Sequence, residues 1–222
     1  MHEGHRARMR DKYLKNGISS LSEHEIAELL LFYSMPRVNT NEIAHTLLAE
    51  FGSLSNALDA DPKDLMNVKG IGEQTAVFLK LIKDIALYCQ KDKWKEKPVL
   101  RHTAEVGTYV QDMIGDLPYE CFFVLSLDSG DKVISFTKLE EGTSACANVD
   151  IRKILECAVR LHANKVVLAH NHPSGRLIPS DSDISLTRML QTSFEPFGIT
   201  VLDHIIVGGG GYLSLAEKQY IK

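Results

Sequence analysis

The chain lacks the features that mark membrane and secreted proteins. No apolar run approaches the length of a membrane span, and the N-terminal stretch MHEGHRARMRDKYLKNG has no hydrophobic segment of the kind a secretory signal needs. The four cysteines form no Cys-x-x-Cys pair, and two of them lie in strongly apolar contexts, so we expect buried structural thiols. These absences predict a cytoplasmic protein with no membrane partner.

The chain also lacks an excess of positive charge. Its 222 residues carry a formal net charge of -4, which argues against wholesale electrostatic attachment to nucleic acid but does not exclude a local basic patch. The apolar fraction of 44% and the charged fraction of 24% are average for globular proteins. The length is sufficient for one large or two small globular domains.

The first part of the chain has helical patterning with recognisable start signals. Ser22 followed by Glu25 fits a capping box, in which each side chain satisfies a backbone amide of the first turn. Proline is tolerated in the first helical turn, so Asp61 before Pro62 is typical of another start. A further helix is expected to begin at Thr40 and end at Gly52. Short helices and short turns predict a small all-helical domain.

A charged segment without periodicity, QKDKWKEKPVLRHT, separates this part from the rest. We therefore predict a helical domain at 1–90, a linker at 91–102 and a second domain at 103–222. Helices are expected near 103–115, at 150–163 and from about 180, and strands at 120–128, 132–142, 165–170, 199–208 and 212–217. Because strands alternate with helices but hairpins are also present, the second domain is expected to be α/β (α+β) with a mixed sheet.

The segment AHNHPSGRLIPSDSD, at 169–183, has the spacing of a metal site. A chain that stays extended across Asn171 points the imidazoles of His170 and His172 to the same side. Ser180 and Asp183 fall in the first turn of the next helix, from which a carboxylate can point back toward the strand end. Two His nitrogens and one Asp oxygen form an open three-ligand zinc site, in which a bound water would have its pKa lowered to about 7.

Each part of this segment also has a simpler interpretation. Ser-x-x-Asp at a helix start is an ordinary capping pattern, and Pro-Ser-Gly is typical of a turn. A single histidine at a strand end is usually a polar surface residue. The full His-x-His-x7-Ser-x2-Asp spacing is much rarer than its parts, and this combination favours the metal site.

Together, the segment HNHPSG…PSDSD and the later DHIIVGGGGYLSL resemble the RadC family (UPF0758), whose C-terminal domain belongs to the JAMM (MPN+) zinc metallopeptidase group. The resemblance covers essentially the whole chain. It implies zinc ligands at His170, His172 and Asp183, and a hydrogen-bond donor near the developing oxyanion at Ser180. It also implies a cytidine-deaminase-like mixed sheet between helices.

A zinc hydrolase of this type also needs a carboxylate that is not a ligand, to take a proton from water and deliver it to the leaving amine. The resemblance points to Glu120, at the start of the strand ECFFVLSLD. Glu140 and Glu141 in the next strand are competitors, and a solvated residue at a strand start is the simpler interpretation of Glu120. Ser180 could act electrostatically on the oxyanion.

Three nearby polar residues could support the site. Asp203 and His204 lie in the strand VLDHIIVG, and either could orient a ligand imidazole. Alternation puts them on opposite faces, so at most one is expected to do so, and a structural hydrogen bond is an equally good interpretation. Asn171 is expected to shape its loop through bonds to the backbone.

The stretch LMNVKGIGEQTAVFLKLIKDIA looks like a helix-hairpin-helix motif, a module that contacts DNA backbones without reading sequence. Gly70 and Gly72 would permit the turn and expose amides at a helix N-terminus, and Lys69 would lie near a phosphate. Against DNA binding through residues 66–76, Glu73 follows the turn and residues 1–98 carry equal numbers of acidic and basic side chains.

Two functions follow from these patterns. The first is a zinc-dependent metallohydrolase that cleaves a peptide or isopeptide bond. The second is a DNA-structure-binding protein of repair or recombination whose metal is structural or regulatory, although an open site argues against a purely structural metal. Phosphodiester cleavage is disfavoured because no second carboxylate cluster is evident, and deamination because its His/Cys/Cys ligands are absent. The substrate, the resident metal and the oligomeric state are not determined by the sequence.

Overall fold

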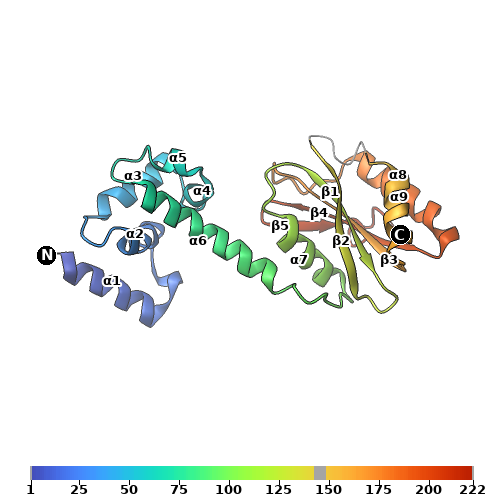
Figure 1. Ribbon diagram of the computed structural model, residues 1–222, viewed down its shortest axis with the longest axis horizontal. Coiled ribbons are helices and arrows are strands. Elements are labelled where there is room, and N and C mark those ends of the chain that lie inside the picture. The colour runs from blue at the N-terminus through green and yellow to red at the C-terminus, as the bar shows by residue number, and fades with distance from the viewer. Residues whose placement is uncertain (1, 143–148, 222) are drawn as a thin grey trace. The chain divides into compact units, whose positions relative to one another are not determined.

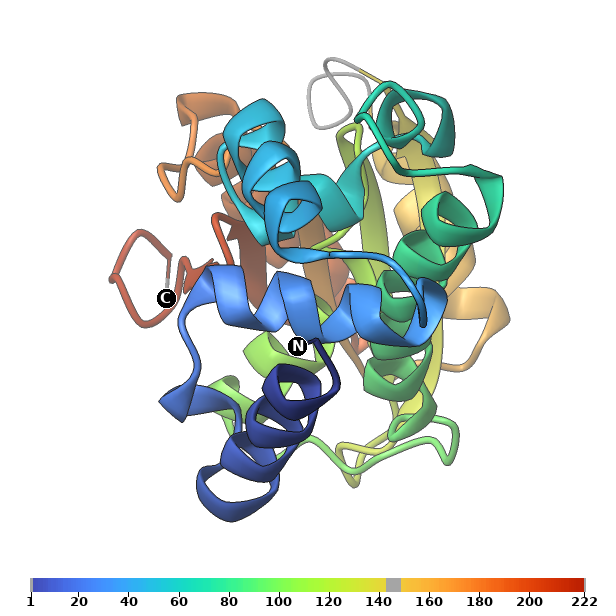
Figure 2. The ribbon, with the colours of Figure 1, turned by 90° about the vertical axis from the view of Figure 1, so that its left-hand side faces the viewer.

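The computed structural model describes residues 2–142 and 149–221. Its contacts divide the chain into two compact units, at 1–89 and 90–222. Figure 1 labels the helices and strands of both units, and Figure 2 turns the helical unit toward the reader. No helix in the described ranges is long and apolar enough to cross a membrane.

The first unit is built from helices alone within its described residues. They are α1 (His2–Asn16), a short 3-10 turn (Ile18–Ser20), α2 (Glu23–Ser34), α3 (Asn41–Phe51), α4 (Leu54–Asp59), α5 (Pro62–Leu65) and the first part of α6 (Glu73–Asp92). The capping box of Ser22 and Glu25 and the Asp61 cap are confirmed. α3 begins and ends where expected, but the Thr40 side chain makes no capping hydrogen bond.

A tight turn joins α5 to α6 and confirms the helix, glycine turn, helix arrangement. Gly70 has a φ of 97°, and a Cβ placed there would lie 2.9 Å from Ile43 Cδ1. Only glycine combines this backbone conformation with this close approach. Ile71 is buried in the core of the unit, and the Gly72 carbonyl accepts from the Ala76 amide.

The second unit contains a five-stranded mixed sheet. Its elements are α7 (Thr103–Ile114), β1 (Cys121–Leu127), β2 (Val133–Glu141), α8 (Ile151–Arg160), β3 (Lys165–Asn171), α9 (Asp181–Phe194), a 3-10 turn (Glu195–Phe197), β4 (Thr200–Gly208) and β5 (Gly211–Ser214). The strand order is β2-β1-β3-β4-β5. The β3–β4 pair is parallel and the other pairs are antiparallel, which confirms the α+β prediction.

Helices cover both faces of this sheet (Figure 1). On one face, Phe122 and Leu168 pack with Ile154 of α8 and Leu190 of α9. On the other face, a second cluster contains β1, β3 and β4 side chains together with Val110 of α7. Successive residues of a strand point to opposite faces, so even-numbered residues of β3 face α8 and α9 and odd-numbered residues face α7.

Several details differ from the sequence-based expectations. The last strand ends at Ser214 instead of continuing to 217, because the chain turns after it. Glu120 precedes β1 instead of opening it. Cys121 and Cys157 are buried as expected, but Cys89 is exposed because α6 has left the helical core at this point. Cys146 lies outside the described residues.

The segment after Gln90 packs with the second unit. Gln90 Nε2 and Trp94 Nε1 donate to the two carboxylate oxygens of Asp112 on α7, at 2.6 and 2.8 Å. Trp94 also packs against the cluster that contains α7. The domain limits at 90 and 102 stay predictions.

Candidate metal centre

The two histidines lie at the end of a strand in the middle of the sheet. His170 is the last but one residue of β3, and the His172 amide donates to the Val207 carbonyl at 2.7 Å, which continues the β3–β4 pairing by one step. Because the backbone stays extended across Asn171, both imidazoles leave the same face. His170 Nε2 lies 2.9 Å from His172 Nε2. The predicted convergence of the two rings is therefore present.

A chain of hydrogen bonds behind His170 determines which of its nitrogens carries a proton. The Thr187 hydroxyl donates to the Asp183 carbonyl, so its oxygen accepts from His204 Nδ1 at 2.7 Å. His204 Nε2 is then an acceptor, and it lies 2.8 Å from His170 Nδ1. His170 therefore donates through Nδ1 and has a free lone pair on Nε2.

The other histidine is held from its far side as well. His172 Nδ1 donates to the Arg176 carbonyl at 2.7 Å, so its Nε2 also carries a lone pair. Two lone pairs thus face each other across 2.9 Å. This arrangement is unfavourable unless a cation or a proton lies between the nitrogens.

The third converging group comes from the first turn of α9. Ser180 is the N-cap, and both its amide and its hydroxyl donate to Asp183 Oδ2 at 2.7 Å. Asp183 Oδ1 lies 3.8 Å from His170 Nε2 and has no hydrogen-bond partner among the described residues, although it is buried. Asp183 therefore takes part in the capping box through Oδ2 while its Oδ1 points toward His170.

Burial governs the protonation of this cluster. It lowers the pKa of His204 to about 4, and it lowers the pKa of His170 well below the usual value for histidine, so both rings are neutral at neutral pH. Burial opposes ionisation of Asp183, but the His170 ring and the bonds from Ser180 outweigh it and hold the pKa of that carboxyl below its usual value. An anion and neutral imidazoles are the forms that bind metals.

Among the described residues, one group of His, Cys, Asp or Glu side chains is compact enough to hold a metal. It consists of His170, Asp183 and His204, whose potential ligand atoms lie within 4.8 Å of one another. The predicted ligand His172 is not part of this group, although its Nε2 lies 2.9 Å from His170 Nε2, and both nitrogens of His204 have hydrogen-bond partners. The orphaned Asp183 Oδ1 and the two facing lone pairs fit a zinc ion, which takes His nitrogen and Asp oxygen ligands.

The side chains of His204 and Asp203 point to opposite faces of the sheet, as the alternation along a strand predicts. His204 faces the site and orients His170. Asp203 faces the other way, where it accepts from the Ser214 hydroxyl and the Ala216 amide, and burial raises its pKa. Thr187 was missed by the sequence analysis. Its only sequence signal is its position four residues after Asp183, on the same face of α9.

Glu120 lies directly before β1, the strand that pairs with the histidine-bearing strand β3. Phe122 pairs directly with His170, and the Gly142 amide bonds to the Glu120 carbonyl, so the strand stays extended to Glu120. The β1–β3 ladder ends at the Phe122–His170 pair, two residues after Glu120 along the chain. Glu120 is half-buried, and within the described residues its carboxylate makes no hydrogen bond or ion pair.

The two competing glutamates have partners. Glu140 is paired with Lys153 of α8, and Glu141 with Lys138 of its own strand. Each of these two carboxylates is occupied by a lysine, so Glu120 is the one of the three without an ion pair among the described residues.

Glycine residues allow the His172 loop to lie directly on the β4–β5 turn. A Cβ on Gly208 would lie 3.2 Å from the His172 carbonyl oxygen, and one on Gly209 would lie 2.8 Å from the Gly175 carbonyl oxygen. Gly209 also has a φ of 55°. The run GGGG therefore supports the loop that carries His172.

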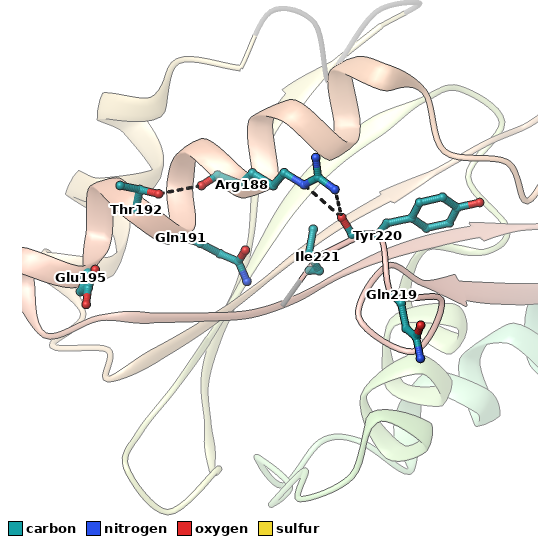
Figure 3. Close-up of a pocket in the computed structure, with 7 residues that line it drawn as sticks. All are labelled: Arg188, Gln191, Thr192, Glu195, Gln219, Tyr220 and Ile221. Carbon is teal, nitrogen blue, oxygen red and sulfur yellow. Dashed lines mark hydrogen bonds between the residues drawn. The ribbon is translucent and has the colours of Figure 1, made fainter.

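A separate cavity of about 710 Å³ lies on the far part of α9 and the C-terminal segment (Figure 3). Arg188 spans it and donates through Nε and Nη2 to the Tyr220 carbonyl, at 3.1 and 2.7 Å. None of the converging groups lines this cavity. Its size therefore does not mark it as the reactive site.

The residues of the helix-hairpin-helix do not converge in the same way. Lys69, Gly70 and Gly72 are exposed. Gly70 and Gly72 line a cavity of about 630 Å³ at the N-terminus of α6, together with Arg37 and Glu73. This cavity therefore combines the glycine turn with one cationic side chain, Arg37, and one anionic side chain, Glu73.

Comparison with known proteins shows the family of this chain. Residues 100–220 match the RadC-like JAB domain and residues 3–77 match the UPF0758 N-terminal region. A UPF0758 protein of Fusobacterium nucleatum subsp. nucleatum is 36% identical over 99% of this chain and 97% of its own. UPF0758 proteins of Burkholderia mallei and Burkholderia pseudomallei are each 34% identical over 96% of this chain and 76% of theirs. The family predicted from the HNHPSG segment is confirmed: the chain belongs to the RadC (UPF0758) family and has a RadC-like JAB domain in its second unit.

Proposed function

We propose that this protein is a zinc-dependent metallohydrolase of the JAMM type that cleaves peptide or isopeptide bonds. The observation that supports this most strongly is that His170 Nε2 lies 2.9 Å from His172 Nε2 and 3.8 Å from the buried Asp183 Oδ1, at the end of β3. Three protein ligands leave one position open, as in catalytic zinc sites.

Each side chain around the zinc would have a separate role in hydrolysis. His170, His172 and Asp183 hold the ion, and the His204–Thr187 chain keeps His170 in the tautomer that binds. When bound, zinc supplies Lewis-acid chemistry that polarises a carbonyl and makes water nucleophilic at neutral pH. Glu120 takes a proton from the attacking water and delivers it to the leaving amine.

Ser180 has two roles in this scheme. Its hydroxyl now donates to Asp183 Oδ2, which fixes the carboxylate. To stabilise an oxyanion, that hydroxyl must rotate toward the substrate, while the Ser180 amide continues to hold Asp183. Removal of one such donor typically reduces the rate by a factor of about a hundred to a thousand.

Elemental analysis of the purified chain beside two variants tests the proposal. We expect one zinc per chain, lost in His172→Ala and retained in Glu120→Gln, because only the first residue is a ligand. Glu120→Gln should lower kcat on cleavable peptides by about 100-fold to 10,000-fold. Absence of zinc from the parent chain, or zinc unaffected by His172→Ala, would contradict the proposal.

A second function, binding to DNA backbones, is favoured by one observation. Arg37 lines the same cavity as Gly70 and Gly72, so a cation lies beside the exposed amides of α6. Other basic residues near the N-terminus are engaged: Arg6 binds four backbone carbonyls, and Lys12 binds Glu25. Fluorescence anisotropy with a labelled duplex at several salt concentrations tests this function, and undetectable binding at low salt excludes it.

A further inference from the structure

We propose that Asn171, the residue between the two histidines, is a positioning residue that holds Glu120 beside the metal centre. The inference deepens the proposed function and rests on it for the roles of zinc and Glu120. It concerns a side chain that faces away from the metal ligands.

Asn171 lies on the opposite face of β3 from His170. Its side chain points to the same face as those of Val167 and Ala169, which belong to the cluster that contains α7. It is 2% exposed, so its polar side chain requires partners within the protein. It cannot serve as a ligand from that face.

All three partners of Asn171 belong to the segment that delivers Glu120. Its Oδ1 accepts from the Cys121 amide at 2.9 Å. Its Nδ2 donates to the Tyr119 carbonyl at 2.9 Å and to the Leu117 carbonyl at 3.2 Å. The bonds to residues 119 and 121 hold the backbone on both sides of Glu120.

This arrangement links the ligands to the base through one residue. The backbone of Asn171 fixes the spacing of His170 and His172, and its side chain fixes the segment 117–121. Without the side chain, the segment 117–121 loses three bonds to β3, while the contacts of His172 with Arg176 and of His170 with His204 remain. A misplacement of about 1 Å can lower a rate about a hundredfold.

The test compares Asn171→Ala with Val167→Ala, a buried change on the same strand and face that removes no hydrogen bond. The probe is zinc alone, and the signal is the ¹³Cδ chemical shift of the Glu120 carboxylate. In the parent chain we expect added zinc to move this shift. In Asn171→Ala we expect one zinc per chain but little movement, and in Val167→Ala the parental movement.

Activity gives a second readout. We expect Asn171→Ala to lower kcat about a hundredfold. The Glu120→Gln/Asn171→Ala double variant should be no slower than Glu120→Gln, because both changes remove the same step. If Asn171→Ala does not fold, Asn171→Asp keeps the acceptor for the Cys121 amide, loses both donors, and should lose the zinc-induced shift in the same way.

The outcomes separate this inference from the proposed function. A zinc-induced shift that persists in Asn171→Ala, or disappears equally in Val167→Ala, overturns the role of Asn171. A parent chain that binds zinc and shows the shift but cleaves no peptide contradicts the hydrolase and leaves the positioning role intact. A parent chain that binds zinc without any shift at Glu120 overturns the positioning role.

Discussion

Two loops of this protein have similar residues but differ in what surrounds them. The His172 loop contains a glycine at 175 and the Gly70 turn contains glycines at 70 and 72, and each leads into a helix N-terminus. Around His172, side chains from β3, β4 and α9 converge in the interior, and their partners determine the protonation of each nitrogen. Around Gly70, the polar groups are exposed and face solvent. A chemical role therefore depends on convergence and burial more than on the local pattern.

The strongest test of the converging site is Asp183→Asn. The amide removes the charged ligand, so we expect zinc to lose its stabilising effect in this variant. At zinc concentrations a thousand times the Kd, the parent should gain about 4 kcal/mol in free energy of unfolding. Thermal unfolding with and without zinc measures the difference.

Asp181→Asn provides the matched control, because Asp181 is an exposed acid in the same helical turn. It should retain the full zinc effect. If Asp183→Asn is stabilised by zinc as much as the parent, Asp183 is not a ligand.

The next effect concerns the hydrogen-bond chain behind His170. Thr187→Val removes the acceptor for His204 Nδ1 without changing any ligand. We expect zinc affinity to fall by about 10-fold to 100-fold, the usual cost of losing a partner behind a metal-binding histidine. Competition with a chelator measures the affinity, and an unchanged value would show that the chain does not control His170.

The glycine run should show a smaller and more local effect. Gly209→Ala and Gly210→Ala both introduce a Cβ at a positive φ, which costs about 1–2 kcal/mol in unfolding free energy. Only at Gly209 does that Cβ meet another backbone, whereas nothing lies within 4 Å at Gly210. Gly209→Ala should therefore weaken zinc binding as well, while Gly210→Ala should not. Equal zinc affinities in a titration would contradict the packing role.

The smallest effect is expected at the exposed loop. If the hairpin contacts DNA, Lys69→Gln should reduce the slope of log affinity against log salt by about 0.9, the value of one phosphate contact. Lys63→Gln, on the preceding short helix, is the control and should leave the slope unchanged. The same slope in Lys69→Gln as in the parent would exclude Lys69 from the contact.

The sequence by itself determined the features that depend on neighbours along the chain. The capping boxes, the helix and strand order, and the His-x-His geometry follow from short spacings, because backbone periodicity places such residues predictably. The family also follows from these motifs, and the comparisons confirm it. The roles of the individual site residues stay predictions.

Only the tertiary structure decided which distant residues meet. Asn171 bonds to Cys121, fifty residues earlier in the chain, and His204 bonds to Thr187, which no spacing rule connects. The lysine partners of Glu140 and Glu141 are likewise visible only in the folded chain, and the role of Glu120 stays a prediction. Register across a sheet is set by packing of whole faces, and this non-local condition is not contained in any one segment.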